Sequence, residues 1–196
     1  MQNKLIYIYS IALFINVVCA NTQLILDEIY LKLNINRNKI HAEGYCGILD
    51  TIIHEQNDLI PIGNNILGKE IFLSKKCAYS WENMKKDALK DSIHISVLSG
   101  FRYYNKQYMI IKNKLDRGLT FETILQENKL PGLSHHHSGN AIDITSNSYK
   151  LSLEFEKSLA YLWLIKNAHK YGFYLQYPKN NKSGIMFEPW HWYFKE

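Results

Sequence analysis

The sequence predicts an α+β protein in which a small antiparallel sheet is flanked by helices. Three observations favour this class. Apolar residues recur every three or four positions in much of the first half, as helices require. Apolar and polar residues alternate over 93–97, as in a half-buried strand. Further short strand-like segments then gather towards the C-terminus, so helices precede most of the predicted sheet.

The first 20 residues resemble a leader peptide. Lys4 precedes the apolar run 5–18, and Ala20 closes a small-residue pattern that suits signal peptidase. We therefore expect a signal peptide over 1–20 and an exported protein, periplasmic or extracellular. A buried N-terminal helix and lipid attachment at Cys19 are the alternatives.

The composition is that of an ordinary globular protein. The chain has 196 residues, 46% hydrophobic and 21% charged, which argues against a disordered tail or a disulfide-dense miniprotein. The sequence contains no internal repeat, so residues 21–196 are expected to form one domain. We also expect the protein to be a monomer. Without the leader, 22 basic residues face 18 acidic ones, a net charge of +4. This excess predicts no nucleic-acid partner, and no stretch reaches the roughly 18 apolar residues of a membrane span.

Two cysteines remain after the leader, Cys46 and Cys77. An oxidising compartment would allow them to pair, whereas two separate buried thiols fit the sequence equally well.

Periodicity predicts the elements of the N-terminal half. Helical spacing covers 24–33 and 45–53, and again 81–88. Between them, 57–69 is rich in Asn, Gly and Pro and predicts a loop or a short irregular hairpin. The alternation over 93–97 predicts the first strand of the sheet.

The C-terminal half alternates more quickly between element types. A helix is predicted over 104–115, ended by Gly118, and a short strand over 141–144. Two further strands are predicted at the end of the chain, over 173–177 and 190–194.

The segment 152–170 gives the strongest helix prediction. Glu154 lies near its start and Lys170 near its end, as the helix dipole favours, and Gly172 follows. Apolar residues occupy two faces, so we expect a largely buried helix.

Three segments concentrate residue types suited to zinc chemistry: Ser99–Gln107, Ser134–Asp143 and Glu188–His191. His and Asp offer nitrogen and oxygen ligands, and a catalytic zinc site keeps three protein ligands and one open position. Gly139 allows a turn after the three consecutive histidines, and Asp143 lies on the strand that follows. A histidine before the turn and Asp143 after it could therefore converge on one ion.

The last segment offers a third ligand. Pro189 favours an extended backbone at Glu188, so this segment need not follow the helical HExxH spacing. Glu188 could lie beside the metal without binding it, where a general base takes a proton from water. Each segment taken alone also has a purely structural explanation, namely a polar loop, a strand end or a simple ion pair. Three of them in this order between Ser99 and His191 favour a site.

The three segments together resemble the motifs of a known family. Ser134-x-His136-x-x-Gly139-x-Ala141-x-Asp143 is similar to the SxHxxGxAxD motif of the VanY-type D-alanyl-D-alanine carboxypeptidases. Glu188-Pro-Trp-His191 is similar to their ExWH motif, and Ser99-Gly-Phe-Arg102 with Gln107 to their SG[YF]R…Q stretch. These enzymes belong to the LAS zinc peptidases, which include VanX-like dipeptidases and share their fold with hedgehog domains. The resemblance spans about 80–194.

The resemblance implies one zinc ion held by His136, Asp143 and His191. Register selects His136 among the three histidines, because only His136 lies two residues after Ser134 and three before Gly139.

The resemblance also implies the remaining roles. Glu188 would be the catalytic base, and Arg102 would stabilise the oxyanion or hold a substrate carboxylate. The substrate contacts implied are Ser134, Gln107 and Trp190.

The expected function is therefore that of an exported zinc peptidase that trims peptidoglycan stem peptides, as a D-alanyl-D-alanine carboxypeptidase. An endopeptidase with the same site is the nearest alternative. A non-catalytic zinc-stabilised binding module is the alternative from another class, against which the presence of Glu188 and Arg102 argues.

Overall fold

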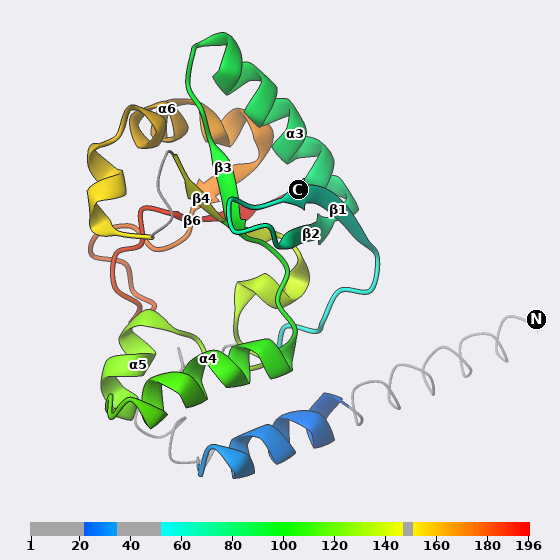
Figure 1. Cartoon of the computed structure of the whole chain (residues 1–196), viewed down its shortest axis with the longest axis vertical. Helices are drawn as coiled ribbons and strands as arrows, with labels where there is room; N and C mark the ends of the chain where they lie inside the picture. The colour runs from blue at the N-terminus through cyan, green and yellow to red at the C-terminus, as the bar shows by residue number, and fades with distance from the viewer. Residues whose placement is uncertain (1–21, 35–51, 147–150) are drawn as a thin grey trace, which may run out of the picture.

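The computed structural model describes residues 22–34, 52–146 and 151–196 (Figure 1). The predicted signal peptide, the greater part of the helix predicted over 45–53, and Cys46 lie outside these ranges and stay predictions. No helix within the described ranges is long and apolar enough to cross a membrane.

The described elements confirm the α+β class. A helix over 22–32 comes first, and a two-stranded antiparallel hairpin and a four-stranded antiparallel sheet follow, with helices around them. The elements are β1 (Leu59–Asn64), β2 (Glu70–Ser74), α3 (Lys75–Lys90), β3 (Ser96–Ser99), α4 (Tyr104–Asp116), α5 (Phe121–Glu127), η1 (His135–Ser138), β4 (Ala141–Thr145), η2 (Leu153–Lys157), α6 (Leu159–Asn167), η3 (Ala168–Tyr171), β5 (Phe173–Leu175) and β6 (His191–Phe194).

The larger sheet has the strand order β3-β4-β6-β5, with every neighbouring pair antiparallel. Since side chains alternate along a strand, each strand shows one face to the core and one to the other side. Ile142, Ile144 and Trp192 point into a core shared with α3 and α6. Asp143 and His191 occupy the opposite face, which is therefore free to carry chemistry.

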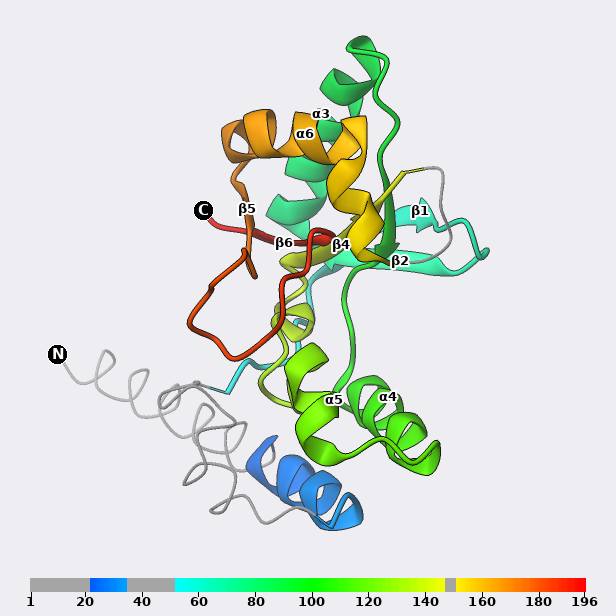
Figure 2. The ribbon, with the colours of Figure 1, turned by 90° about the vertical axis from the view of Figure 1, so that its left-hand side faces the viewer.

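Within the described ranges, the buried apolar residues form two clusters, which divide this part of the molecule into two halves. The sheet half contains the four-stranded sheet, α3 and α6. The helical half contains the helix over 22–32, α4 and α5, with Leu26, Ile111 and Ile124 fully buried at its centre. Figures 1 and 2 both place these helices at one end of the molecule, away from α3 and α6.

The prediction of one buried helix over 152–170 is wrong. The segment divides into η2, α6 and η3, because Ser158 is extended and its hydroxyl caps a new helix by accepting the N–H of Tyr161 at 3.1 Å. Nor is the segment buried on two faces. Leu159, with 73% of its surface exposed, and Leu162, with 57%, point outwards.

Other boundaries differ from the predictions by smaller amounts. The strand expected over 93–97 runs instead from Ser96 to Ser99, and the residues before it form the turn that follows α3. The segment 57–69 contributes to an irregular hairpin, one of the two predicted alternatives, with a register shift between Pro61 and Asn64. Helix α5 was not predicted. Cys77 is a free thiol within the core, and burial raises its pKa.

Candidate metal centre

The register of the sheet brings two of the predicted ligands together. Asp143, on the central strand β4, lies directly opposite His191 on β6 and opposite Ser99 on β3. The carboxylate oxygen Oδ1 of Asp143 is 3.0 Å from Nδ1 of His191. Backbone pairing between β4 and β6 thus fixes the relative positions of these two candidate ligands.

The third ligand comes from the short 3₁₀ helix η1, which enters β4 through Gly139. Gly139 has a left-handed backbone, with φ of 69°, and a Cβ there would lie 2.8 Å from the backbone nitrogen of Ser74. Only glycine fits this turn without strain. The turn delivers His136 to the cluster, where its Nε2 is 3.3 Å from Oδ2 of Asp143.

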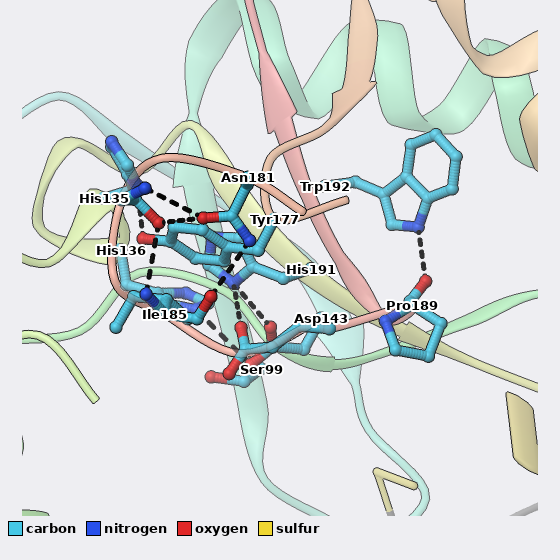
Figure 3. Close-up of polar contacts among 12 residues, drawn as sticks. Ser99, His135, His136, Asp143, Tyr177, Asn181, Ile185, Pro189, His191 and Trp192 are labelled. Carbon is cyan, nitrogen blue, oxygen red and sulfur yellow. Dashed lines mark hydrogen bonds and ion pairs between the residues drawn. The ribbon is translucent and has the colours of Figure 1, made fainter. Parts of the chain in front are cut away.

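The three consecutive histidines have different surroundings, and only His136 joins the cluster. The candidate ligand atoms of His136, Asp143 and His191 all lie within 4.8 Å of one another, and the three side chains are buried. His135 turns to the hydroxyl of Tyr177, at 3.1 Å (Figure 3). The structure therefore groups the three residues that the family resemblance implied as metal ligands.

The hydrogen bonding of His136 shows that this cluster suits a cation. Its Nδ1 is 2.7 Å from the carbonyl oxygen of Gly100, which only accepts, so Nδ1 carries the proton. Burial and the neighbouring Arg102 lower the pKa of His136 to about 4, so the ring is neutral at pH 7. Its Nε2 lone pair then faces a carboxylate oxygen of Asp143, and two acceptors face each other. A metal ion between them would satisfy both, and a backbone carbonyl behind a ligating imidazole is the usual support of such a site.

Asp143 is held in its charged form. Burial alone would raise its pKa, but the neighbouring imidazoles of His136 and His191 hold the pKa well below the usual range. One carboxylate and two imidazoles are the ligands that zinc accepts in catalytic sites.

Glu188 lies beside this cluster, just before β6. Its Oε2 is 3.8 Å from Nδ1 of His191, and the residue is buried. Burial, followed by the charge of Asp143, raises the pKa of Glu188 to about 9, while Arg102 acts in the opposite direction. A divalent cation at the cluster would also favour the charged carboxylate. Glu188 is therefore placed to exchange a proton near the metal position.

Arg102 also lies beside Asp143. Its Nη2 donates to the hydroxyl of Ser99 at 3.0 Å and lies 3.6 Å from Oδ2 of Asp143. Its Nη1 donates to Oε1 of Gln107 at 2.8 Å. Burial lowers its pKa, whereas Asp143 and Glu188 raise it. Arg102 is thus an oriented cation within the site, not an ordinary surface ion pair.

Gln107 was predicted as a substrate contact, and the structure gives it a supporting position as well. The residue is almost fully buried on α4, and its amide nitrogen donates to the carbonyl of Lys129 at 2.6 Å. With its oxygen accepting from Arg102, both ends of the amide are occupied. Gln107 therefore holds Arg102 towards the cluster.

His137 links the two halves of the molecule. The N–H of Gly132 donates to its Nε2 at 3.1 Å, so Nδ1 carries the proton and donates to the carbonyl of Arg102 at 2.6 Å. The ring is fully buried and meets Tyr104 edge to face, with 4.6 Å between ring centroids. His137 thus fixes the backbone of Arg102 against the helical half.

A cleft of about 380 Å³ opens over the cluster. Every residue named above as a candidate for catalysis, substrate contact or metal binding lines it, including Ser134 and Trp190. Residues of α4 and α5 also line the cleft, among them Lys114 and Glu127.

Sequence reasoning missed several of the contributing groups. Ser99 was noted only as part of a motif, yet it lies opposite Asp143 and accepts from Arg102. Lys114 and Glu127 gave no signal, because charged residues at helix ends are common on any surface. Helix α5 could have been found from its cap, since the hydroxyl of Thr120 accepts the N–H of Thr123.

Comparison with known proteins agrees with this geometry. Residues 70–196 match the VanY family, described as D-alanyl-D-alanine carboxypeptidase. A D-alanyl-D-alanine carboxypeptidase of Enterococcus faecium is 32% identical over 72% of the chain and 44% of its own length. One of Enterococcus faecalis is 30% identical over 54% of the chain and 41% of its own length. The chain thus spans less than half the length of these curated relatives.

Solved structures show the same fold. The LD-carboxypeptidase LdcB, whose structure concerns peptidoglycan recognition, is 30% identical, with a TM-score of 0.66 over 72% of this chain and 69% of that one. A variant of the vancomycin resistance D,D-pentapeptidase VanY in complex with Zn(II) is 26% identical, with a TM-score of 0.56 over 76% of this chain and 88% of that one. Fold and site define a zinc-peptidase type of protein. The family match covers well over half of the chain, which therefore belongs to the VanY D-alanyl-D-alanine carboxypeptidase family.

Proposed function

We propose that the protein is a zinc-dependent D-alanyl-D-alanine carboxypeptidase that acts on peptidoglycan stem peptides. The observation that carries the proposal is the buried His136, Asp143 and His191 cluster, with Glu188 and Arg102 beside it in one cleft. Family membership and the Zn(II) complex of a related pentapeptidase support the choice of metal and reaction.

His136, Asp143 and His191 would hold the zinc ion. When bound, zinc supplies Lewis acidity that polarises the peptide carbonyl and lowers the pKa of water. Glu188 would accept the proton of the attacking water and pass it to the leaving amine. Its position beside His191, without a place in the ligand cluster, suits this role.

Arg102 would donate hydrogen bonds to the developing oxyanion or to the terminal carboxylate of the peptide. Ser99 and Gln107 hold the guanidinium in place before the peptide arrives, so little reorganisation is needed. Ser134 and Trp190 would contact the peptide from the sheet side of the cleft.

The remaining elements of the proposal concern the whole chain. We infer export to the cell envelope through the signal peptide over 1–20, and a single peptidase domain over 21–196. The similarity to LdcB, whose structure concerns peptidoglycan recognition, supports this location.

The decisive experiment is to incubate the purified protein with muropeptides, with and without a chelator, and to identify products by mass. Loss of one terminal D-alanine, prevented by the chelator and restored by zinc, is expected. Internal cuts would replace the carboxypeptidase with an endopeptidase. Absence of any chelator-sensitive product would favour the non-catalytic binding module.

A further inference from the structure

The segment 52–58, which precedes β1, runs from one half of the molecule to the other (Figure 1). At its start, Ile52 packs against the core of the helical half, and just after it Ile60 packs against the core of the sheet half. The segment lies before residue 70, where the match to the family begins. The proposed mechanism does not use it.

Backbone hydrogen bonds join this segment to the parts of the chain that support the site. The N–H of Ile53 donates to the carbonyl of Gly132 at 2.7 Å, and the carbonyl of Ile53 accepts from the hydroxyl of Tyr104 at 2.8 Å. The N–H of Gln56 donates to the carbonyl of His137 at 2.9 Å. These partners also contact one another, because the His137 ring accepts from Gly132 and meets Tyr104 edge to face. The segment is therefore bound to a connected set of residues.

Glu55 adds a side-chain contact at the point where α4 begins. Its Oε1 accepts the N–H of Tyr104, the first residue of α4. The N-cap residue Tyr103 makes no side-chain cap hydrogen bond, and the first turn of α4 has no acidic residue. The first N–H groups of a helix have no partner within the helix, and a carboxylate there also complements the helix dipole. Glu55 thus supplies, from 49 residues earlier in the chain, a cap that α4 does not provide for itself.

The capped end of α4 carries groups that orient Arg102. Arg102 lies two residues before α4, and Gln107, within the helix, accepts from its guanidinium at 2.8 Å. The other contacts of the guanidinium, with Ser99 and Asp143, come from the sheet. A movement of the start of α4 would displace Arg102 and Gln107 relative to the sheet. The orientation of the guanidinium therefore depends on how firmly the start of α4 is held.

We propose that Glu55 is a positioning residue, which fixes the guanidinium of Arg102 towards the metal cluster through its hydrogen bond to Tyr104. Among the described residues, Glu55 does not line the cleft, so it acts through Arg102 and not on the peptide. This inference rests on the proposed function, since it requires Arg102 to act on a peptide. It extends the functional site to a part of the chain that lies before the family match.

Two substitutions of Glu55 test the hydrogen bond. With zinc-loaded protein and a stem pentapeptide, Glu55→Ala should lower kcat/KM by about tenfold, because small displacements of a group that acts on the reacting bond are costly. Glu55→Gln should stay within about threefold of the wild type, because its amide oxygen can accept the same N–H and only the charge is lost. Asp58→Asn, at an exposed position in the same segment, is the matched control and should leave the rate unchanged. An unchanged rate in Glu55→Ala, or equal losses in both Glu55 variants, would overturn the proposal.

A double-mutant cycle separates positioning of Arg102 from general destabilisation. Arg102→Lys keeps the positive charge but loses the planar fork that Ser99 and Gln107 hold. In that background, Glu55→Ala should lower kcat/KM by less than about twofold, because no oriented guanidinium is left to disturb. A tenfold loss in both backgrounds, measured where every variant is folded, would show that Glu55 does not act through Arg102 and would contradict the proposal.

Failure of the positioning role and failure of the proposed function are distinguishable. If the zinc-loaded wild-type protein hydrolyses no stem peptide, the proposed function is wrong. Nuclear magnetic relaxation of the Nε–H group of Arg102, assigned with the Arg102→Lys variant, then tests the role of Glu55 without any reaction. The order parameter of this group should be high in the wild type and in Asp58→Asn, and clearly lower in Glu55→Ala. Equal order parameters in all three proteins would overturn the proposal.

Discussion

The two halves of the molecule hold their functional groups by different means. In the sheet half, Asp143 and His191 are neighbours because backbone hydrogen bonds set β4 against β6 in one register. In the helical half, Lys114 and Glu127 belong to two different helices, and an ion pair joins their side chains at 2.6 Å. A shift of β6 by one residue would turn His191 to the wrong face, whereas the ion pair tolerates small movements of the helices.

This difference matters for the proposed chemistry. Groups that act on the scissile bond need fixed geometry, which a hydrogen-bonded sheet supplies. The contacts between the two halves include the ring contact of His137 with Tyr104 and the N–H of Met186, which donates to the carbonyl of Gln126 at 2.8 Å.

The largest expected effect on hydrolysis comes from removing a ligand of the sheet half. His136→Ala should abolish stoichiometric zinc binding and hydrolysis, because the cluster keeps only two ligands. His135→Ala is the matched control, since His135 bonds to Tyr177 and does not join the cluster. Zinc content by atomic absorption and release of D-alanine check both variants. Zinc loss from the His135 variant alone would mean that the ligand assignment is wrong.

The next largest effect on hydrolysis is expected for Glu188, the proposed catalytic base. Glu188→Gln should lower kcat by about 10²- to 10⁴-fold, because the amide cannot accept the proton of water. Zinc content should not change, since Glu188 lies outside the ligand cluster. Glu156→Gln serves as control, because Glu156 forms an ion pair with Lys179 away from the cleft. A Glu188 variant with full activity would remove Glu188 from the mechanism.

A smaller effect on hydrolysis is expected for His137, which links the two halves of the molecule. His137→Leu leaves the N–H of Gly132 and the carbonyl of Arg102 without partners, at a cost of about 1–3 kcal/mol each in the free energy of unfolding. Because Arg102 then loses a support, kcat/KM should fall about tenfold with zinc retained.

The conservative variant separates a positioning role from general destabilisation. His137→Gln should recover most of the rate, because its amide both donates and accepts. The loss in His137→Leu should also be larger for a peptide with a free terminal carboxylate than for its amidated form, as binding to Arg102 requires. Equal losses for both peptides, measured where both variants are folded, would contradict the coupling through Arg102.

The sequence predicted the sheet half better than the helical half, and the reason is physical. Motifs with fixed spacing reflect strand register and tight turns, so the grouping of His136, Asp143 and His191 could be anticipated. Periodicity reports only which helix face is apolar, so the pairing of α4 with α5 could not. The break at Ser158 was also missed, because its cap hydrogen bond interrupts a run of apolar residues that otherwise fits one helix.

The smallest effect on hydrolysis is expected for the core of the helical half. Leu26, on the helix over 22–32, is fully buried and packs so closely on Gly132 that a Cβ there would lie 2.7 Å from its Cδ1. Leu26→Ala should lower the free energy of unfolding by about 2–5 kcal/mol through the cavity it leaves. At temperatures where the protein stays folded, kcat/KM should change by less than about twofold, because the sheet register holds the metal ligands.

The helix over 22–32 precedes the residues that match the family, so this variant also tests whether the helix is part of the domain. Leu31→Ala on the same helix is the control, because its side chain is 79% exposed and its loss should cost less than about 0.5 kcal/mol. Urea unfolding measures both changes. Equal, negligible changes would mean that this helix does not contribute to the domain, whereas a large loss of zinc from Leu26→Ala would mean that the helical half, too, fixes the geometry of the metal site.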